Sequence, residues 1–526
     1  MRIPHKLFSM PYILILILFF IKLMTVVIFY LISGANHIIA LRFCIEIFIF
    51  ELSLLILRRK WKFFIIPFFI AHTAELINFF TVGQLVDITT ILNINEYKAL
   101  GTDTLIKISI LFIVYMLLWI PSYINNNSII NNTKYNIVYI IMFMSLMFTI
   151  HTPVFYFITA FKKAYIIYSF RINPENKSSF LNTHVSSQKI PYNYKDYNII
   201  LLFTEGTSSY VLSEQLTPNA IYLKNKGLTF NNYFSHTAAT FRGIRGQLLS
   251  GFQFIGGYYH DNTGLGQTNK FSLDSKIPQD INLVSILSEN GYKTIFFSPH
   301  AKNSAFNNFL DQIGFSNIIS VYADKTSTDK ELYDLIYKNI IHEHEKGEKF
   351  FIASYIYGTH FGMDSPDLKY GDGSNSYLNK FYNQDHWFGE FLKKLENTDV
   401  LNNTLLIFTS DHATYPSLDC KKTFNTKSEY FVDRIPLIFY TKNMQHMIID
   451  AKNRNSIDFA PTVLNMLNID SPNYFLGRSL FTDTGSVFSY ISHVGDFFDT
   501  STGEVIKKDP DEDILKKINE YFLIFG

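Results

Sequence analysis

The stretch "NIILLFTEGTSS", residues 198–209, decides the fold of the second half of this chain. An apolar run over residues 199–203 ends abruptly at Thr204, Glu205 and Gly206. A short, bounded run of this composition predicts a buried strand. Open α/β sheets bind ligands at the carboxyl ends of parallel strands, so Glu205 is placed where a ligand is expected. Taken alone, a glutamate after a strand is more often a cap or a surface group.

The rest of the second half repeats this strand pattern in alternation with helices. Four further apolar runs are expected to be buried strands: "KTIFFS" (293–298), "FFIASYI" (350–356), "TLLIFTS" (404–410) and "IPLIFY" (435–440). Helical segments lie between them, and one begins at Thr217-Pro218, a capping residue followed by proline at the first helical position. The alternation predicts an α/β domain with a parallel or mostly parallel sheet over residues 196–526.

The first part of the chain is a series of long apolar stretches. We expect five helices, over residues 12–32, 38–57, 63–82, 105–121 and 135–158. Each is near the ~20 residues that a helix needs to cross ~30 Å of hydrocarbon. The first stretch is too long for a signal peptide, and no small-residue cleavage site follows it. The sequence therefore predicts a five-helix transmembrane domain over residues 1–160 and a polar linker over residues 161–195.

Basic residues orient these helices. Those expected on the cytoplasmic side are Arg2, Lys6, Arg58, Arg59, Lys60, Lys62 and Lys134. Five crossings then place everything after the fifth helix outside the cytoplasm. Three basic residues on that outer side disagree with this orientation, namely Lys162, Lys163 and Arg171, but the dense cluster at residues 58–62 outweighs them.

Composition excludes some functions. The chain has 46 basic and 45 acidic side chains, which argues against a dedicated nucleic-acid surface. Its two cysteines, Cys44 and Cys420, give no disulfide framework. The expected membrane helices carry two close polar pairs, Arg42 with Glu46 and His72 with Glu75. Such groups either pair internally and fix helix packing, or form a path for a polar lipid headgroup.

A second strand delivers polar residues to the same expected sheet edge. The run "TLLIFTS" is followed directly by Asp411 and His412. Together with Glu205 they form a ligand set of two oxygens and one nitrogen, which suits a divalent cation such as Zn²⁺ or Mn²⁺. An Asp-His pair at a strand end is also common in plain loops. The combination on two separate strand tips favours a metal site.

A reactive partner is expected in "FSHTAATFRGIRGQLLSG", residues 234–251, which is typical of a loop that opens a helix. Thr240 would lie at the helix N-terminus, which favours anions. Coordination to a cation lowers the pKa of a hydroxyl and makes it a nucleophile. Arg242 and Arg245 could clamp a phosphate. An ordinary cap with two surface arginines remains the alternative, and Thr237 is a rival nucleophile.

These motifs, in this order, resemble the sulfatase-like branch of the alkaline phosphatase superfamily. The resemblance also includes "GTHFGMD" (358–364), "IDFAPTVLNMLNI" (457–469) and "FLGRSLF" (475–481). With five N-terminal helices, the chain is similar to the membrane-anchored transferases of that branch. These include phosphoethanolamine transferases, lipoteichoic acid synthase and the phosphoglycerol transferases of periplasmic glucans.

The resemblance implies roles for individual residues. It implies that Thr240 is the nucleophile, and that Thr240 is preferred over Thr237 because of its spacing to "QLLSG". It implies metal ligands at Glu205, Thr240, Asp411 and His412. It also implies that His360 binds the substrate phosphate, and that His300 lies where relatives place substrate contacts.

The implied activity is transfer of a phosphoethanolamine or phosphoglycerol group from phosphatidylethanolamine or phosphatidylglycerol to an envelope glycan such as lipopolysaccharide. The implied location is the bacterial inner membrane, with the catalytic domain on the periplasmic side. A membrane-anchored phosphodiesterase or sulfatase is the alternative, and a non-catalytic binding protein is a third hypothesis. The Cys/Ser-x-Pro-x-Arg pattern of sulfatases is absent, which counts against sulfate-ester hydrolysis. A lone Cys420 argues against the disulfide-rich lipid A transferases.

Overall fold

The structure is a computed structural model. It describes residues 10–33, 36–82, 85–86, 91, 102–125, 133–169, 180–185, 194–251, 281–302, 304–320, 328–482, 490–493, 496–511, 513–514, 517 and 521. Arg2, Lys6 and Arg171, and most of the expected linker over residues 161–195, lie outside this set. Contacts divide the chain into two units, Met1–Ile167 with Ser417–Lys422, and Tyr168–Pro416 with Thr423–Gly526.

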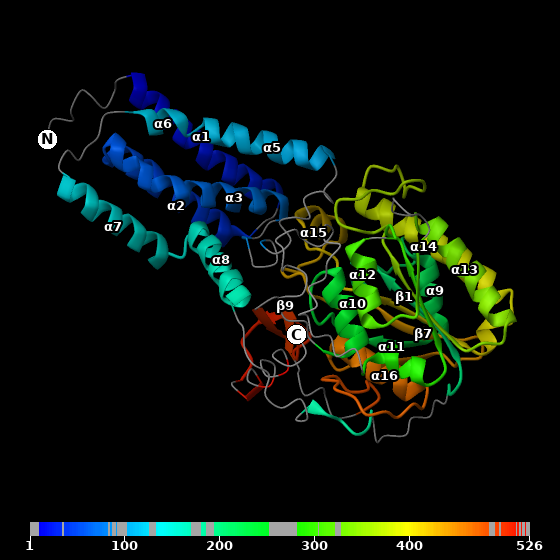
Figure 1. The fold of residues 1–526 in the computed structure, drawn as a ribbon. Helices are drawn as coiled ribbons and strands as arrows, with labels where there is room; N and C mark the ends of the chain where they lie inside the picture. Colours follow the sequence, from blue (N-terminus) through cyan, green and yellow to red (C-terminus); the bar gives the residue numbers. More distant parts are fainter. Residues whose placement is uncertain are drawn as a thin grey trace. The chain divides into compact units, whose positions relative to one another are not determined.

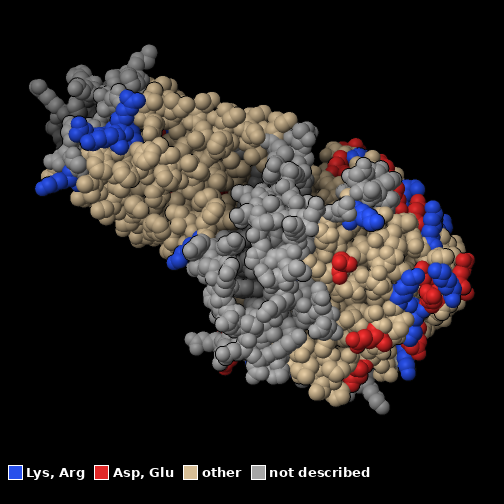
Figure 2. Space-filling model, in the orientation of Figure 1, with Lys and Arg blue, Asp and Glu red and all other residues tan. Residues whose placement is uncertain are grey.

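The first unit is helical (Figure 1). Its helices are α1 (Met10–Ser33), α2 (His37–Ile56), the 3₁₀ helix η2 (Arg59–Ile65), α3 (Ile66–Val82), α5 (Thr102–Leu117), α6 (Ile120–Ile124), α7 (Thr133–Thr149) and α8 (Pro153–Ser169). The face shown in Figure 2 is mostly uncharged over this unit, with Lys and Arg side chains gathered toward one end, and carries charges of both signs over the other unit. A largely uncharged helical surface with basic residues near its end is expected of a membrane domain.

Two helical segments of the described residues are long and apolar enough to cross a membrane, Ile13–Leu31 and Arg59–Phe80. The single helix expected over residues 135–158 is wrong: it is a pair, Lys134–Thr149 and Pro153–Lys162, bent by 80°. Proline cannot donate to the preceding turn, so the helix restarts there. Counting that pair as one span gives three candidates, and the five-crossing prediction is not confirmed.

The polar side chains of α2 are paired inside this unit. The guanidinium of Arg42 donates from Nη1 to the hydroxyl of Tyr156 at 2.7 Å. The carboxylate of Glu46 lies 2.5 Å from His72 Nδ1, and the other ring nitrogen lies 2.7 Å from the Tyr115 hydroxyl. These links join α2 to α3, α5 and α8, so the structure agrees with internal pairing that fixes helix packing.

Two further buried carboxylates of this unit, Glu51 on α2 and Glu75 on α3, also have partners. Lys22 on α1 forms a buried ion pair with Glu51 on α2, and Ser122 on α6 donates to the same carboxylate at 3.1 Å. Glu75 on α3 accepts from the backbone N–H of Val86 at 2.7 Å. Buried charges are tolerated when they are paired in this way.

The second unit is built on an eight-stranded sheet of order β4-β3-β5-β1-β6-β7-β2-β8. The strands are β1 (Asn198–Thr204), β2 (Leu228–Asn231), β3 (Lys293–Ser298), β4 (Asn317–Ser320), β5 (Phe350–Ile356), β6 (Thr404–Ser410), β7 (Leu437–Tyr440) and β8 (Met447–Asp450). A small antiparallel sheet holds β9 (Tyr490–His493), β10 (Asp496–Asp499) and β11 (Ile506–Lys507). All five expected strands are present, which confirms the α/β class.

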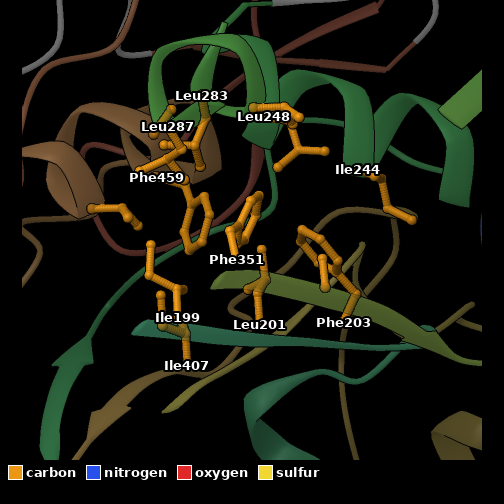
Figure 3. Packing of buried hydrophobic residues seen from close by; sticks show 14 of the residues in the cluster. Ile199, Leu201, Phe203, Ile244, Leu248, Leu283, Leu287, Phe351, Ile407 and Phe459 are labelled. Atoms are coloured by element: carbon orange, nitrogen blue, oxygen red, sulfur yellow. The ribbon is translucent and has the colours of Figure 1, made fainter. Parts of the chain in front are cut away.

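Helices cover both faces of the sheet (Figure 1). They are α9 (Pro218–Lys226), α10 (Thr240–Leu249), α11 (Leu283–Glu289), α12 (Ala305–Ile313), α13 (Asp329–Glu345), α14 (Ser376–Glu396) and α16 (Phe459–Met466), with 3₁₀ turns η5 (Ser209–Val211), η6 (Val400–Asn402) and η7 (Ser456–Asp458). The short helix α15 (Leu418–Phe424) belongs largely to the first unit. Ile199, Leu201 and Phe203 pack against α10, α11 and α16 (Figure 3). Ile200 and Leu202 belong to the opposite core with α9, α13 and α14. Burial on both faces explains the continuous apolar runs.

The sheet is mixed rather than fully parallel. The strand β7 is antiparallel to both neighbours, β6 and β2. The central strands β3, β5, β1 and β6 are parallel, so their carboxyl ends meet at one edge. That edge carries the candidate site.

Candidate active site

The strand tips bring the predicted ligands together. In the parallel register of β1 and β6, Thr204 pairs with Ser410, so Glu205 and Asp411 each follow the last paired residue. All three side chains are almost completely buried, with 3% exposure for Glu205, 0% for Asp411 and 3% for His412. Their potential ligand atoms lie within 4.8 Å of one another. The three residues therefore form a group that could hold a metal ion.

The imidazole of His412 is oriented for this role. Its Nδ1 donates to the carbonyl oxygen of Ala413 at 2.7 Å. The lone pair of Nε2 then faces the carboxylates, at 3.4 Å from Glu205 Oε1 and 3.4 Å from Asp411 Oδ2. A backbone carbonyl that fixes the ring in this way is the usual support of a metal-binding histidine.

The carboxylate of Asp411 tests whether the residues fit a cation. Its Oδ1 accepts from the backbone N–H of Gly206 at 2.8 Å and of His412 at 2.7 Å. Its Oδ2 is buried and accepts no hydrogen bond within the described part of the chain. A buried oxygen without a donor is costly. Together with the O, O, N donor set, this oxygen fits a divalent cation bound between the three residues.

The pKa shifts of these three residues also favour a bound cation. Burial and the charge of Glu205 raise the pKa of Asp411. Burial opposes a charge on His412, but attraction to Asp411 and Glu205 raises the pKa of its ring. Burial also opposes a charge on Glu205, but attraction to His412 and His360 holds its pKa below the ordinary value. Two buried carboxylates this close compete for a proton, and a divalent cation would satisfy both.

Thr240 is the hydroxyl that reaches this cluster. It is the first residue of α10, after a sharp turn in which Ala239 has φ of 71°. Its Oγ1 donates to Glu205 Oε2 at 3.0 Å and lies 3.5 Å from His412 Nε2. The rival Thr237 is buried, with 4% exposure. A strained turn that presents a hydroxyl at a helix N-terminus is a frequent feature of reactive sites.

The position of α10 is fixed by close packing on the loop after β6. A methyl group built on Gly243 would overlap the carbonyl oxygen of Asp411. The amide of Gln247 donates to the carbonyl oxygens of Ser410 at 2.9 Å and Asp411 at 3.3 Å. The helix α10 and the loop after β6 are thus held together by a close backbone approach at Gly243 and by the side chain of Gln247.

One residue of the site has no counterpart in the sequence prediction. The hydroxyl of Tyr355, on β5, donates to Glu205 Oε2 and lies 3.4 Å from Thr240 Oγ1. Tyr355 pairs with Phe203 in the parallel register, which places it beside the tip of β1. The sequence feature that could have identified Tyr355 as a site residue is its position one residue before the end of the apolar run "FFIASYI".

The two predicted substrate histidines lie near Glu205. Burial and the His360 charge lower the pKa of His300 to about 4, while Glu205 opposes that shift. The His300 ring centroid is 6.0 Å from that of Tyr355 and 5.2 Å from that of Tyr357. Burial also lowers the pKa of His360, whose ring packs on Tyr357 at 4.9 Å. With a pKa of about 4, the His300 ring is neutral near pH 7.

The two predicted arginines are buried side chains of α10 itself. Arg242 is 3% exposed, and its Nε donates to the carbonyl oxygen of Ala238 at 3.2 Å. Arg245 is also buried, and burial together with the Arg245 charge lowers the pKa of His236 to about 3. Their role as a phosphate clamp stays a prediction.

Comparisons with known proteins identify the family of this chain. The sequence profile of the family described as Sulfatase matches residues 197–469, just over half of the 526 residues. The chain belongs to the sulfatase family. This sulfatase-family chain is 27% identical over 167 residues to the N-acetylglucosamine-6-O-sulfatase of Bacteroides thetaiotaomicron. The match covers 31% of the chain and 28% of the relative, so the chain spans just over a quarter of the length of that relative.

Two solved structures share the fold of this sulfatase-family chain. A protein of the alkaline phosphatase superfamily from Vibrio parahaemolyticus has a TM-score of 0.51 at 17% identity, covering 69% of this chain and 94% of its own. The lipoteichoic acid synthase LtaP from Listeria monocytogenes has a TM-score of 0.50 at 18% identity, covering 65% and 94%. At these identities the likeness shows the fold alone.

Proposed function

We propose that the protein is a membrane-bound transferase. It moves phosphoethanolamine or phosphoglycerol from phosphatidylethanolamine or phosphatidylglycerol to an envelope glycan such as lipopolysaccharide. Its site lies on the periplasmic side of a bacterial inner membrane. The observation that carries the proposal is the 3.0 Å hydrogen bond from the Thr240 hydroxyl to Glu205, beside a buried group that could bind a cation. Apolar helices in the same chain support a donor that stays in the bilayer.

Each residue of the site has a separate role in the proposed reaction. Thr240 Oγ1 attacks the phosphorus of the lipid and its proton passes to Glu205 Oε2; the P–O bond to diacylglycerol breaks, and the leaving alkoxide takes that same proton from Glu205. The headgroup phosphate remains on Thr240 as an ester, and a sugar hydroxyl then displaces it. His360 and His300 line the substrate side. A divalent cation held by Glu205, Asp411, His412 and Thr240 would acidify the hydroxyl and stabilise phosphoryl charge.

The second candidate is a membrane-anchored hydrolase with the same nucleophile, in which water replaces the sugar. The partial match to an N-acetylglucosamine-6-O-sulfatase favours it. The threonine at position 240 and the absent Cys/Ser-x-Pro-x-Arg pattern weigh against a sulfatase reaction.

Mass spectrometry tests the covalent step. The full-length protein, loaded with zinc or manganese, is incubated with phosphatidylethanolamine or phosphatidylglycerol, and its peptides are then analysed. We expect a headgroup-phosphate adduct on the Thr240 peptide, whose mass identifies the donor. The adduct should be absent from Thr240→Ala and retained by Thr240→Ser and Thr237→Ala. An adduct on Thr237, or none with either lipid, would overturn the proposed nucleophile.

A chase separates transferase from hydrolase. The isolated adduct is exposed to buffer alone or to purified envelope glycan. Rapid loss of the adduct in buffer, with release of free phosphoethanolamine or phosphoglycerol, would identify a hydrolase. Transfer of the label only when glycan is present would identify the transferase.

A further inference from the structure

Tyr355 lies where the metal-binding and nucleophile parts of the site meet. Its side chain is buried, with 1% exposure, and packs among rings of neighbouring elements. The centroid of Phe306 lies 5.3 Å from that of Tyr355, and that of Tyr357 lies 5.9 Å away. These contacts leave the ring little freedom to turn. Its hydroxyl is therefore a fixed donor directed at Glu205.

The hydrogen bonds use both lone pairs of one carboxylate oxygen. Glu205 Oε2 accepts from Tyr355 and, at 3.0 Å, from Thr240. A carboxylate oxygen has two lone pairs in its plane, so Oε2 is fully occupied. The other oxygen, Oε1, faces His412 Nε2 at 3.4 Å. Oε2 of Glu205 thus accepts the two hydrogen bonds, and Oε1 faces the candidate metal site.

We propose that Tyr355 is a positioning residue that makes Glu205 a one-oxygen metal ligand. With Oε2 held by Tyr355, only Oε1 is available to a cation shared with Asp411 and His412. Oε2 then remains as the acceptor for the Thr240 proton. The nucleophile part of this inference rests on the proposed function, but the coordination part does not.

The test compares two identical substitutions in the full-length protein. Tyr355→Phe removes the hydroxyl and keeps the ring. Tyr233→Phe is the matched control, because Tyr233 is fully buried in the same unit and its hydroxyl has no hydrogen-bond partner in the described part of the chain. Thermal unfolding of both variants shows whether either fails to fold.

The first readout is the visible spectrum of the cobalt-substituted protein, which reports coordination number. In Tyr355→Phe, Oε2 becomes free to bind the cobalt. We expect a weaker absorption band, as for a higher coordination number, whereas Tyr233→Phe keeps the spectrum of the unmodified chain. An unchanged spectrum in Tyr355→Phe overturns the proposal.

The second readout is the rate of Thr240 adduct formation at saturating and limiting lipid. We expect the maximal rate to fall about 100-fold in Tyr355→Phe, with the lipid concentration for half-maximal rate unchanged. A variant as fast as the unmodified chain overturns the proposal. If the unmodified chain forms no adduct, the proposed function fails, and the cobalt spectrum alone decides the role of Tyr355.

Discussion

Single residues show which parts of the site the sequence could reveal. Glu205, Asp411 and His412 follow apolar runs directly, so the polar residue and the strand tip coincide in the sequence. Tyr355 does not follow an apolar run but lies inside one, in a strand that is buried on both faces, so the sequence does not mark it as a residue of the site. The pairing of Tyr355 with Phe203 decides which face of the sheet its side chain takes. The same pairing brings its hydroxyl to Glu205. Contacts of this kind come from register and cannot be predicted from composition.

Asp411 is expected to control metal-dependent stability. A cation that binds only the folded state stabilises it by about 2.7 kcal/mol at one hundred times its dissociation constant. Zinc should therefore raise the melting temperature of the unmodified chain above its value in EDTA, and should not do so in Asp411→Asn. Asp385→Asn removes a buried carboxylate outside the cluster and should keep the zinc response. A full zinc response in Asp411→Asn would contradict the site.

Asp329 predicts a pH dependence of stability. It is buried at the start of α13, and its Oδ1 accepts from the backbone N–H of Gly358 at 2.9 Å. Burial raises the pKa of Asp329 from 3.8 to about 7. The folded chain then holds a proton that the unfolded chain has lost, so this group costs stability as pH rises through that window.

Asp329→Asn removes this titration. Its unfolding free energy should match that of the unmodified chain near pH ~4, and should exceed it by about 4 kcal/mol near pH ~8. Denaturant unfolding of both proteins across this range measures the difference. Because the other titrating groups are common to both proteins, a difference that does not change with pH would refute the assignment.

At the scale of elements, the apolar runs predicted the central strands but not the direction of every strand. The strand β7 is as apolar as the parallel strands β1 and β6, yet it runs antiparallel to β6, and nothing in its composition marks that direction. The strands β2, β4 and β8 have four residues each, too short for a clear pattern. The continuous apolar stretch over residues 135–158 concealed a break, because proline ends a helix whatever the hydropathy.

The contact between α10 and the loop after β6 should not tolerate a larger side chain. In Gly243→Ala the new methyl group overlaps the carbonyl oxygen of Asp411, so the helix must move away from the metal ligands. We expect the unfolding free energy to fall by about 1–3 kcal/mol. Zinc affinity and Thr240 adduct formation should fall with it.

The control for that variant is Gly291→Ala. Gly291 has φ of 84°, and a methyl group built on it meets no atom within 4 Å. The unfolding free energy of Gly291→Ala should fall by about 1–2 kcal/mol through backbone strain alone, and the variant should keep full zinc affinity. Isothermal titration with zinc measures both variants. Equal zinc affinity in Gly243→Ala and Gly291→Ala would show that α10 does not hold the site.

On the scale of the whole molecule, the chain joins a helical unit with apolar surfaces to an α/β unit with its own two cores. The proposed membrane-embedded donor would account for the occurrence of both units in one chain. Tethering a catalytic unit beside a lipid raises the effective concentration of the donor.

A truncated protein that begins at Tyr168 should separate catalysis from tethering. We expect it to bind zinc as the full chain does, and to form the Thr240 adduct at least about 100-fold more slowly with phosphatidylethanolamine vesicles. A soluble short-chain donor should react at similar rates with both proteins. Equal rates on vesicles would show that the helical unit has no part in donor delivery.

The paired polar residues of α2 also bear on how the chain is made. Asp, Lys and Arg at the centre of a membrane helix each cost about 2.5–3.5 kcal/mol on insertion scales. A helix with Arg42, Glu46 and Glu51 is thus a poor substrate for the translocon when it emerges alone. The partners of Glu51 and Glu46, on α1 and α3, flank it in the chain. We expect α2 to wait at the translocon until α3 has been synthesised, and to enter the bilayer together with these neighbours.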